Sequence, residues 1–253
     1  MNLTGFQTLA RRELRRTFQI INQVIWPPIM STLLYVLIIG LSVGGRLEAA
    51  TGVRYVEFLI PGLIALTVIE ASFAESSASL FQHRFMNSIQ ELLTAPLSAL
   101  EIVAGFLTGS VARALLLGNL LMLFLPAFTQ RWPAHWGLYL ALMVVIAVLF
   151  SAVGLIVGLW GEKWDHIAIP QTFLFTPLIW LGGAFSPVSL MPEALRGLVQ
   201  LNPFFYVIDA FRFAVLGRAE APLALSIGIT LTLAAGASAL ALRLFAVGWK
   251  LRA

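Results

Sequence analysis

The chain alternates between long apolar stretches and short polar connections. Six apolar stretches stand out, at 25–44, 58–80, 102–128, 137–160, 167–185 and 222–245. About 20 helical residues, each rising about 1.5 Å, cross the hydrocarbon core of a bilayer. The pattern therefore predicts an all-α polytopic membrane protein in which six transmembrane helices form a single transmembrane domain over residues 1–253.

Residues 1–24 are predicted to form an amphipathic helix that lies along the membrane surface. At helical spacing, apolar side chains gather on one face and polar ones on the other. The polar face includes Arg11, Arg12, Arg15 and Arg16. Such a helix binds membrane lipid through its apolar face and through anionic headgroups. The polar face also suits a cytoplasmic docking partner, and the two interpretations are compatible.

The same arginines predict the orientation of the chain. Positive charges beside the first span usually stay in the cytoplasm. Six spans return the chain to the side on which it starts. Both termini are therefore expected in the cytoplasm.

The inner connection between the second and third spans, residues 81–97, is predicted to contain a short amphipathic helix. Apolar residues recur there at helical spacing until Pro96, which ends the helix because proline has no backbone N–H. Ser98 and Glu101 then form a capping box for the third span. A helix held between two spans either packs on the protein surface or serves as a handle by which a cytoplasmic partner moves both spans.

The outer connection before the last span, residues 187–221, is too apolar for a solvated loop. Prolines break it into two predicted helices, 191–201 and 204–216, around the turn Asn202-Pro203. Because these helices have almost no polar face, we expect them to dip back into the outer leaflet against protein.

Five charged residues are expected within the membrane region. Asp209 and Arg212 stand i,i+3 in the second outer helix, a spacing that allows them to pair. Glu70 and Glu75 lie in the second span and Arg113 in the third, where each costs about 2.5 to 3.5 kcal/mol without a partner. Counted from the cytoplasmic side, Glu70 matches Arg113 in height, so we expect that pair. Three roles for this ion pair stay open. It is a packing contact between two helices, a substrate contact or gate, or part of a proton relay.

Three Gly-x-x-x-Gly motifs, at 40–44, 105–109 and 154–158, allow neighbouring helices to approach closely. Such motifs are frequent in apolar segments and do not indicate a function. We expect them to pack helices within one subunit.

Composition excludes several classes of protein. Hydrophobic residues make up 59% and charged residues 11% of the chain, which excludes a water-soluble globule. The net charge of +4 is attributed to lipid-binding arginines, so no nucleic-acid partner is expected. The chain has no cysteine, and its three histidines lie in connections without ligand spacing. We therefore expect no metal site, no catalytic residue and no cofactor bound by this chain.

The sequence also lacks a phosphate-binding loop, which is a glycine-rich segment ending in Lys-Ser or Lys-Thr. The only lysines are Lys163 and Lys250, and an apolar residue follows each. Any ATP-driven task therefore needs a second polypeptide.

Several short motifs occur in an order typical of one family. They are ELLTAPL at 91–97, VAR at 111–113, LGGAFSP at 181–187, LNPF at 201–204 and FR at 211–212. Together with the amphipathic start and the six spans, they resemble the permease subunit of bacterial type-2 ABC exporters, the ABC-2 permease family. The resemblance covers nearly the whole chain.

The resemblance implies a homodimer in the bacterial inner membrane, with each copy bound to a cytoplasmic ATPase that holds ATP and Mg. Closure of the ATPases would reshape a path between the copies for an amphiphilic substrate, such as a drug, a lipid or a lipid-linked glycan. Residues 85–96 would be the coupling helix and 190–216 the outer re-entrant helices. The implied ATPase-coupling residues are Arg84, Phe85, Ile89, Gln90, Glu91 and Leu92. Glu70 and Glu75 are not part of the family motifs.

Two rival interpretations stay open. An ion-coupled secondary transporter would use Glu70, Glu75 and Arg113 as a relay, but such carriers usually consist of two related halves. Here the outer helical pair occurs only before the last span. A structural scaffold explains neither the inner helix nor the charges within the spans.

Overall fold

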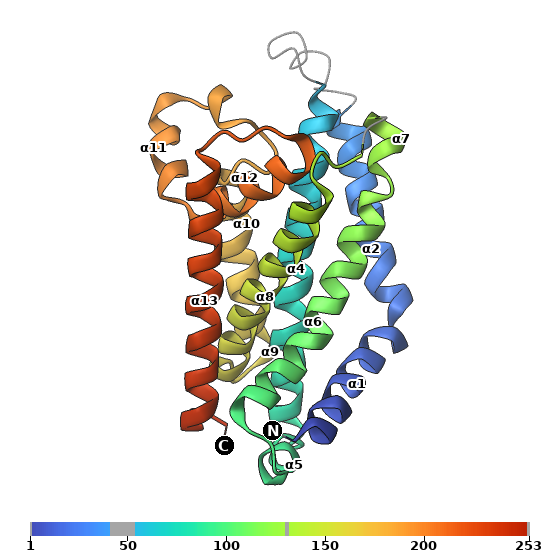
Figure 1. Cartoon of the computed structure of the whole chain (residues 1–253), viewed down its shortest axis with the longest axis vertical. Coiled ribbons are helices and arrows are strands. Elements are labelled where there is room, and N and C mark those ends of the chain that lie inside the picture. Colours follow the sequence, from blue (N-terminus) through green and yellow to red (C-terminus); the bar gives the residue numbers. More distant parts are fainter. Residues whose placement is uncertain (1, 41–53, 130–131, 252–253) are drawn as a thin grey trace.

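The structure, a computed structural model, describes residues 2–40, 54–129 and 132–251. All regular elements in these ranges are helices, and the long ones run side by side in one bundle (Figure 1). The start of α1, the end of α13 and α5 lie at one end, which we call the coupling end. α11 and α12 lie at the opposite end, the outer end (Figure 1).

The elements are α1 (Leu3–Gln19), α2 (Ile21–Tyr35), η1 (Val36–Gly40), α4 (Tyr55–Phe85), α5 (Ile89–Thr94), α6 (Ala99–Met122), α7 (Leu125–Thr129), α8 (Trp136–Trp160), α9 (Trp164–Ile169), η2 (Pro170–Phe175), α10 (Thr176–Leu181), η3 (Val188–Leu190), α11 (Glu193–Leu201), α12 (Pro203–Leu216) and α13 (Leu223–Val247).

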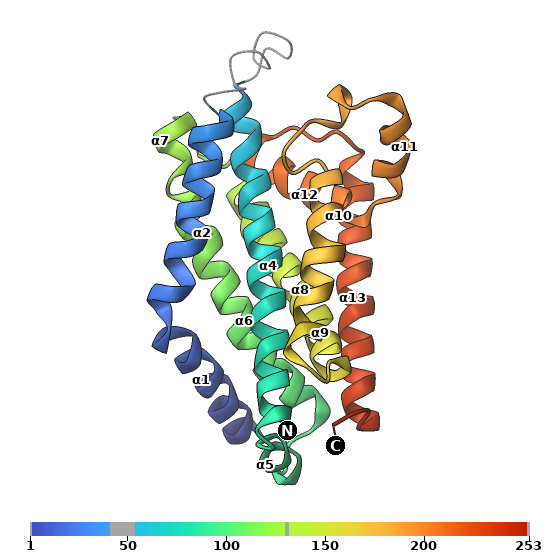
Figure 2. The same cartoon turned by 180° about the vertical axis from the view of Figure 1, so that it is seen from behind.

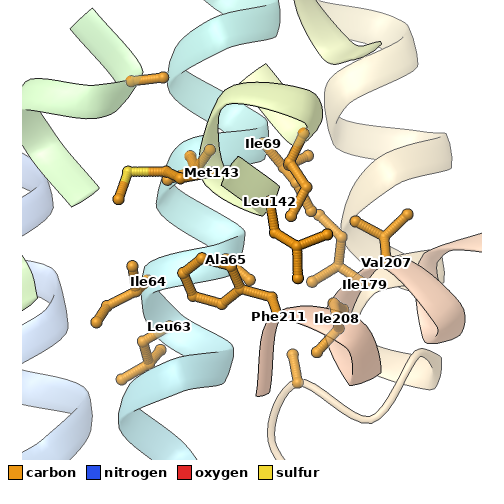
Figure 3. Packing of buried hydrophobic residues seen from close by; sticks show 14 of the residues in the cluster. Leu63, Ile64, Ala65, Ile69, Leu142, Met143, Ile179, Val207, Ile208 and Phe211 are labelled. Carbon is orange, nitrogen blue, oxygen red and sulfur yellow. The ribbon is translucent and has the colours of Figure 1, made fainter. Parts of the chain in front are cut away.

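The core surrounds α4, which packs against α6, α8 and α12. Figure 3 shows apolar side chains from four helices meeting there. They include Leu63, Ile64, Ala65 and Ile69 of α4, Leu142 and Met143 of α8, Ile179 of α10, and Val207, Ile208 and Phe211 of α12. The outer helix α12 is thus part of the bundle core and does not float on its surface.

Small residues bring the helices together, as expected. A Cβ atom on Gly154 of α8 would lie 2.1 Å from the Ser76 hydroxyl oxygen of α4, and one on Gly109 of α6 would lie 2.8 Å from Glu13 Cβ of α1. The motifs at 105–109 and 154–158 therefore pack helices within this chain. The motif at 40–44 and the predicted first span both end outside the described residues.

Five helices in the described ranges are long and apolar enough to cross a bilayer. They are Ile21–Gly40, Tyr55–Phe85, Ala99–Thr129, Trp136–Trp160 and Leu223–Val247. The fold is the predicted all-α polytopic membrane protein. The predicted span 167–185 differs, because it forms a column of shorter pieces, α9, η2 and α10 (Figure 2). Pro170 and Pro177 lack the N–H that a continuous α-helix needs, and a π-helical segment lies between them.

The outer connection forms two helices, α11 and α12, as the sequence predicts, and they are bent by 88° relative to each other. Asn202 makes this bend. Its side-chain oxygen accepts from the Phe204 N–H at 3.0 Å, and its Nδ2 donates to the Leu178 carbonyl of α10 at 2.6 Å. Pro203 is the first residue of α12, where a missing N–H costs least.

The inner connection is shorter than predicted. α4 continues to Phe85, Asn87 takes a left-handed conformation with φ of 57°, and α5 covers only Ile89–Thr94. The apolar periodicity of the span runs on into the connection, so sequence alone places the helix boundary too early. Arg84 and Phe85 therefore belong to the last turn of α4. The capping box of Ser98 and Glu101 is confirmed at the start of α6.

Candidate functional site

At the coupling end, α5 presents two different faces. Ile89 and Leu92 are buried, and they pack in a cluster with Leu9 of α1, Phe106 of α6 and Phe245 of α13. Gln90 and Glu91 are exposed. α5 thus takes part in this buried cluster through its apolar face and leaves its polar face exposed.

Arg84 is turned inward from this surface. Its Nη1 donates to the carbonyls of Gly158, Leu159 and Gly161 at 2.9, 2.8 and 2.8 Å. These carbonyls lie at the end of α8, where a helix has no intrahelical donor to offer them. Arg84 therefore ties α4 to α8, and its role as an ATPase contact stays a prediction.

Phe85 and Met86 are the most prominent apolar side chains beside α5. They are 68% and 64% exposed. Phe85 borders a cavity of about 220 Å³ that is also lined by Gln90 and Glu162. Large apolar side chains exposed at one place mark a surface suited to binding another protein.

Glu13 of α1 is a buried carboxylate that the sequence reasoning missed. Its side chain is 1% exposed, and its Oε2 accepts from the Ser79 hydroxyl at 2.6 Å. Its Oε1 lies 3.4 Å from the His83 ring, and Arg16 approaches to 3.6 Å. The sequence contains one signal for this site, because Glu13 is the single acidic residue in a segment with four arginines.

The environment of Glu13 favours its charged form. Burial raises the pKa of the Glu13 carboxyl, but hydrogen bonds with His83 and Ser79 and the charge of Arg16 lower it more. The pKa therefore lies below its ordinary value. The buried face of α1 consists of Leu9, Ala10, Glu13 and Thr17. α1 is thus oriented by a polar contact as well as by its apolar residues.

Glu75, rather than Glu70, is the partner of Arg113, which corrects the expected pair. The Glu75 Oε2 forms an ion pair with Arg113 Nη1, and its Oε1 lies 2.5 Å from Arg16 Nη2. Helical side chains lean toward the N-terminus of their helix. α6 starts at the coupling end and α4 ends there, so Arg113 leans toward the coupling end while Glu75 leans away from it. A comparison of heights alone ignores this convergence.

Together these contacts form a continuous polar chain, which we call the inner network. It begins at Ser88 beside α5, whose hydroxyl is 2.7 Å from the His83 ring, and ends at Arg113 in the membrane interior. The members in order are Ser88, His83, Glu13, Arg16, Glu75 and Arg113. The inner network connects α5, α4, α1 and α6.

Arg113 also borders a cavity of about 360 Å³ near the middle of the bundle. Residues of α2, α4, α6 and η2 line it. Figure 2 shows α4 with α2 on one side and the column of α9 and α10 on the other. Glu70 and Arg113 are the charged residues in the lining, and Gln171 of η2 reaches it from the opposite side.

At the outer end, Asp209 and Arg212 do not pair with each other, which corrects the second expected ion pair. Asp209 is fully buried and accepts from the Glu220 N–H at 2.7 Å, the Ala221 N–H at 3.3 Å and the Ser226 hydroxyl at 2.9 Å. It therefore holds the start of α13 against α12.

Arg212 is directed elsewhere. Its Nη2 donates to the Gly183 carbonyl at 2.6 Å, its Nη1 lies 3.7 Å from the Glu220 carboxylate, and its guanidinium stands 3.8 Å from the centre of the Phe58 ring. Glu220 in turn accepts from the Val188 N–H at 2.7 Å. We call Asp209, Arg212 and Glu220, together with their partners, the outer network. It fixes the turn after α10, η3 and α12 to one another.

The described ranges contain no group of three or more His, Asp or Glu side chains arranged to hold a metal ion. The polar side chains brought together by the fold serve as links between helices, and one of them, Arg113, borders the cavity in the bundle. The arrangement is suited to transmitting movement and to binding a ligand within the membrane.

The fold defines a multi-pass helical membrane protein whose two ends are built differently. The chain belongs to the ABC-2 type transporter family, whose model matches residues 4–216. It is 36% identical over 220 residues to the inner membrane transport permease YadH of Escherichia coli K12. The aligned residues make up 87% of this chain and 86% of YadH. It is 31% identical over 191 residues to Nodulation protein J of Sinorhizobium fredii, covering 74% and 72% of the two chains. The predicted family is confirmed, and the chain is a multi-pass transport permease of the inner membrane.

Proposed function

We propose that this chain is the membrane subunit of an ATP-driven exporter, which works as a homodimer with separate cytoplasmic ATPase subunits. Membership in the ABC-2 type transporter family supports the transport role. The observation that carries the coupling to an ATPase is the surface made by Phe85, Met86 and the exposed edge of α5. The ATPase would hold ATP and Mg, and this chain would bind neither.

The division of α5 into a buried and an exposed face suits this role. The ATPase would contact Gln90 and Glu91. It would also pack against Phe85, an exposed apolar side chain that borders the adjoining cavity. Ile89 and Leu92 would pass the movement on, because they belong to one buried apolar cluster with residues of α1, α4, α6, α8 and α13. Close packing transmits displacement, since a core has little empty space to absorb it.

The inner network supplies a second route into the membrane. Ser88 contacts His83 at 2.7 Å, so a displacement of α5 acts on the contacts of Glu13 with α4. Arg16 touches both Glu13 and Glu75 and passes the change to the ion pair with Arg113. Arg113, one member of this pair, borders the cavity between α2, α4 and η2. We assign this face of the bundle to the path of an amphiphilic substrate.

Coexpression with a candidate ABC ATPase subunit tests the proposal. Glu91→Arg reverses an exposed charge on α5 and should abolish copurification and ATP-driven transport while the permease remains folded. Glu193→Arg, an exposed change on α11 at the outer end, is the matched control and should leave both unchanged. Unaltered association and transport in Glu91→Arg would contradict the coupling role of α5.

The orientation has its own test. We propose that both termini are cytoplasmic, because the coupling surface lies at the same end of the bundle as the start of α1 and the end of α13 (Figure 1). Reporter fusions at Ala253 and within residues 49–52 should report opposite sides of the membrane. A reporter at Ala253 that is active only outside the cytoplasm would contradict the assignment.

A further inference from the structure

Glu70 is a carboxylate for which the described residues offer no partner. It is the middle residue of α4, is partly buried and borders the cavity of about 360 Å³. Within the described ranges it forms no hydrogen bond and no ion pair. A carboxylate at this depth costs free energy unless a cation or a hydrogen-bond donor faces it.

Arg113 borders the same cavity but is already used. Glu75 binds its guanidinium, and Arg16 shares that carboxylate. The positive charge in the lining is thus neutralised by a partner, whereas the negative charge of Glu70 is not. The cavity therefore favours a cationic ligand over an anionic one.

Two uncharged polar groups of the lining can accept hydrogen bonds from a protonated amine. Ser31 donates its hydroxyl proton to the Pro28 carbonyl at 3.1 Å, and Thr67 donates to the Leu63 carbonyl at 2.9 Å. Each hydroxyl oxygen retains lone pairs that accept a hydrogen bond. These two hydroxyls therefore add acceptors to the lining, beside the side-chain donors of Tyr35, Gln171 and Arg113.

The remainder of the lining is apolar, and it continues onto exposed apolar side chains. Leu66, Ala71 and Leu117 contribute to the wall. Two of the elements that line it expose further apolar side chains, Met30 and Leu34 on α2 and Phe173 and Leu174 on η2. A ligand that places a cation against Glu70 can lay an apolar body along these helices.

We infer that the cavity between α2, α4 and η2 binds the protonated amine of a cationic amphiphile, with Glu70 as the charge-recognising residue and Ser31, Thr67 and Gln171 as acceptors around it. That such an amphiphile is the exported substrate rests on the proposed export function. Binding of the amine at this cavity concerns this chain alone, and it is tested without an ATPase.

The test is equilibrium binding to the full chain in nanodiscs of zwitterionic lipid, with empty nanodiscs as the background. The probes are a dodecyl chain with a dansyl sulfonamide at one end and a free primary amine at the other, and the same chain with a hydroxyl group in place of the free amine. The wild-type chain should bind the amine at least about tenfold more tightly than the alcohol, and Glu70→Gln should remove at least about tenfold of the affinity for the amine alone.

Three variants make the result specific. Glu70→Asp retains the charge and should restore most of the preference for the amine. Leu117→Trp fills the cavity and should weaken binding of both probes. Glu193→Gln removes an exposed carboxylate at the outer end and should change neither.

Equal affinity of wild type and Glu70→Gln for the amine would overturn the inference, as would equal affinity of the wild type for both probes. Failure of the exporter proposal would show instead as a chain that binds no ATPase subunit, whatever its affinity for the amine. The two failures are therefore distinguishable.

Discussion

The two ends of the bundle both carry charged networks, but the networks differ in what their charges touch. In the outer network, Asp209 and Arg212 are almost fully buried and bind mainly backbone groups of neighbouring segments. In the inner network, the charges bind other side chains, and the arginines stay partly exposed, with 28% of the Arg16 side chain accessible.

This difference suggests different mechanical roles. A side chain bound to backbone groups fixes the position of a segment, because those groups cannot turn away. Arg16 and Glu75 can exchange partners within the inner network without leaving a charge alone, since each contacts two oppositely charged residues. The outer end is therefore built as a clamp, and the coupling end is built to rearrange.

Breaking the clamp should give the largest loss of stability. Asp209→Leu leaves the Glu220 and Ala221 N–H groups and the Ser226 hydroxyl without their acceptor, and each buried unsatisfied group costs about 1 to 3 kcal/mol. We expect the free energy of unfolding to fall by about 3 to 5 kcal/mol. Unfolding in detergent measures it, with the exposed Glu193→Leu as the control. A loss no greater than that of the control would show that the outer network is no clamp.

The ion pair with Arg113 should matter less, because Arg16 remains as a second partner for Glu75. Arg113→Leu should lower the free energy of unfolding by about 2 kcal/mol, and a double-mutant cycle with Glu75→Leu should give a coupling of about 1 kcal/mol. The same cycle with Glu70→Leu should be additive, since Glu70 and Arg113 do not pair. Coupling to Glu70 in place of Glu75 would reverse the assignment.

The smallest effect is expected at Glu13, and it should depend on pH. Because the pKa of Glu13 lies below its ordinary value of 4.5, its contribution is complete above that value and is lost as the pH falls through the lower pKa of the folded state. Glu13→Gln should cost about 1 kcal/mol at neutral pH.

Acidification from about pH 6 to about pH 3 should then destabilise the wild type more than Glu13→Gln. Thermal unfolding curves of both proteins across this range provide the measurement. Parallel losses in the two proteins would show that Glu13 does not hold α1 through its charge.

The sequence by itself determined the all-helical membrane fold, the helix pair around Asn202 and the capping box at Ser98. These features follow from partition of apolar side chains out of water and from hydrogen bonds between residues close in the chain. Both depend on local order, which periodicity and spacing record directly.

The tertiary structure decided which charges meet. The i,i+3 spacing of Asp209 and Arg212 allowed a pair, yet each residue found backbone partners on other segments. Arg113 forms its ion pair with Glu75 and not with Glu70, because side chains on antiparallel helices lean in opposite directions. Glu13 is buried because Gly109 allows α1 to approach α6 closely. Such contacts depend on helix tilt, crossing and side-chain direction, which are set only when all the helices are packed together.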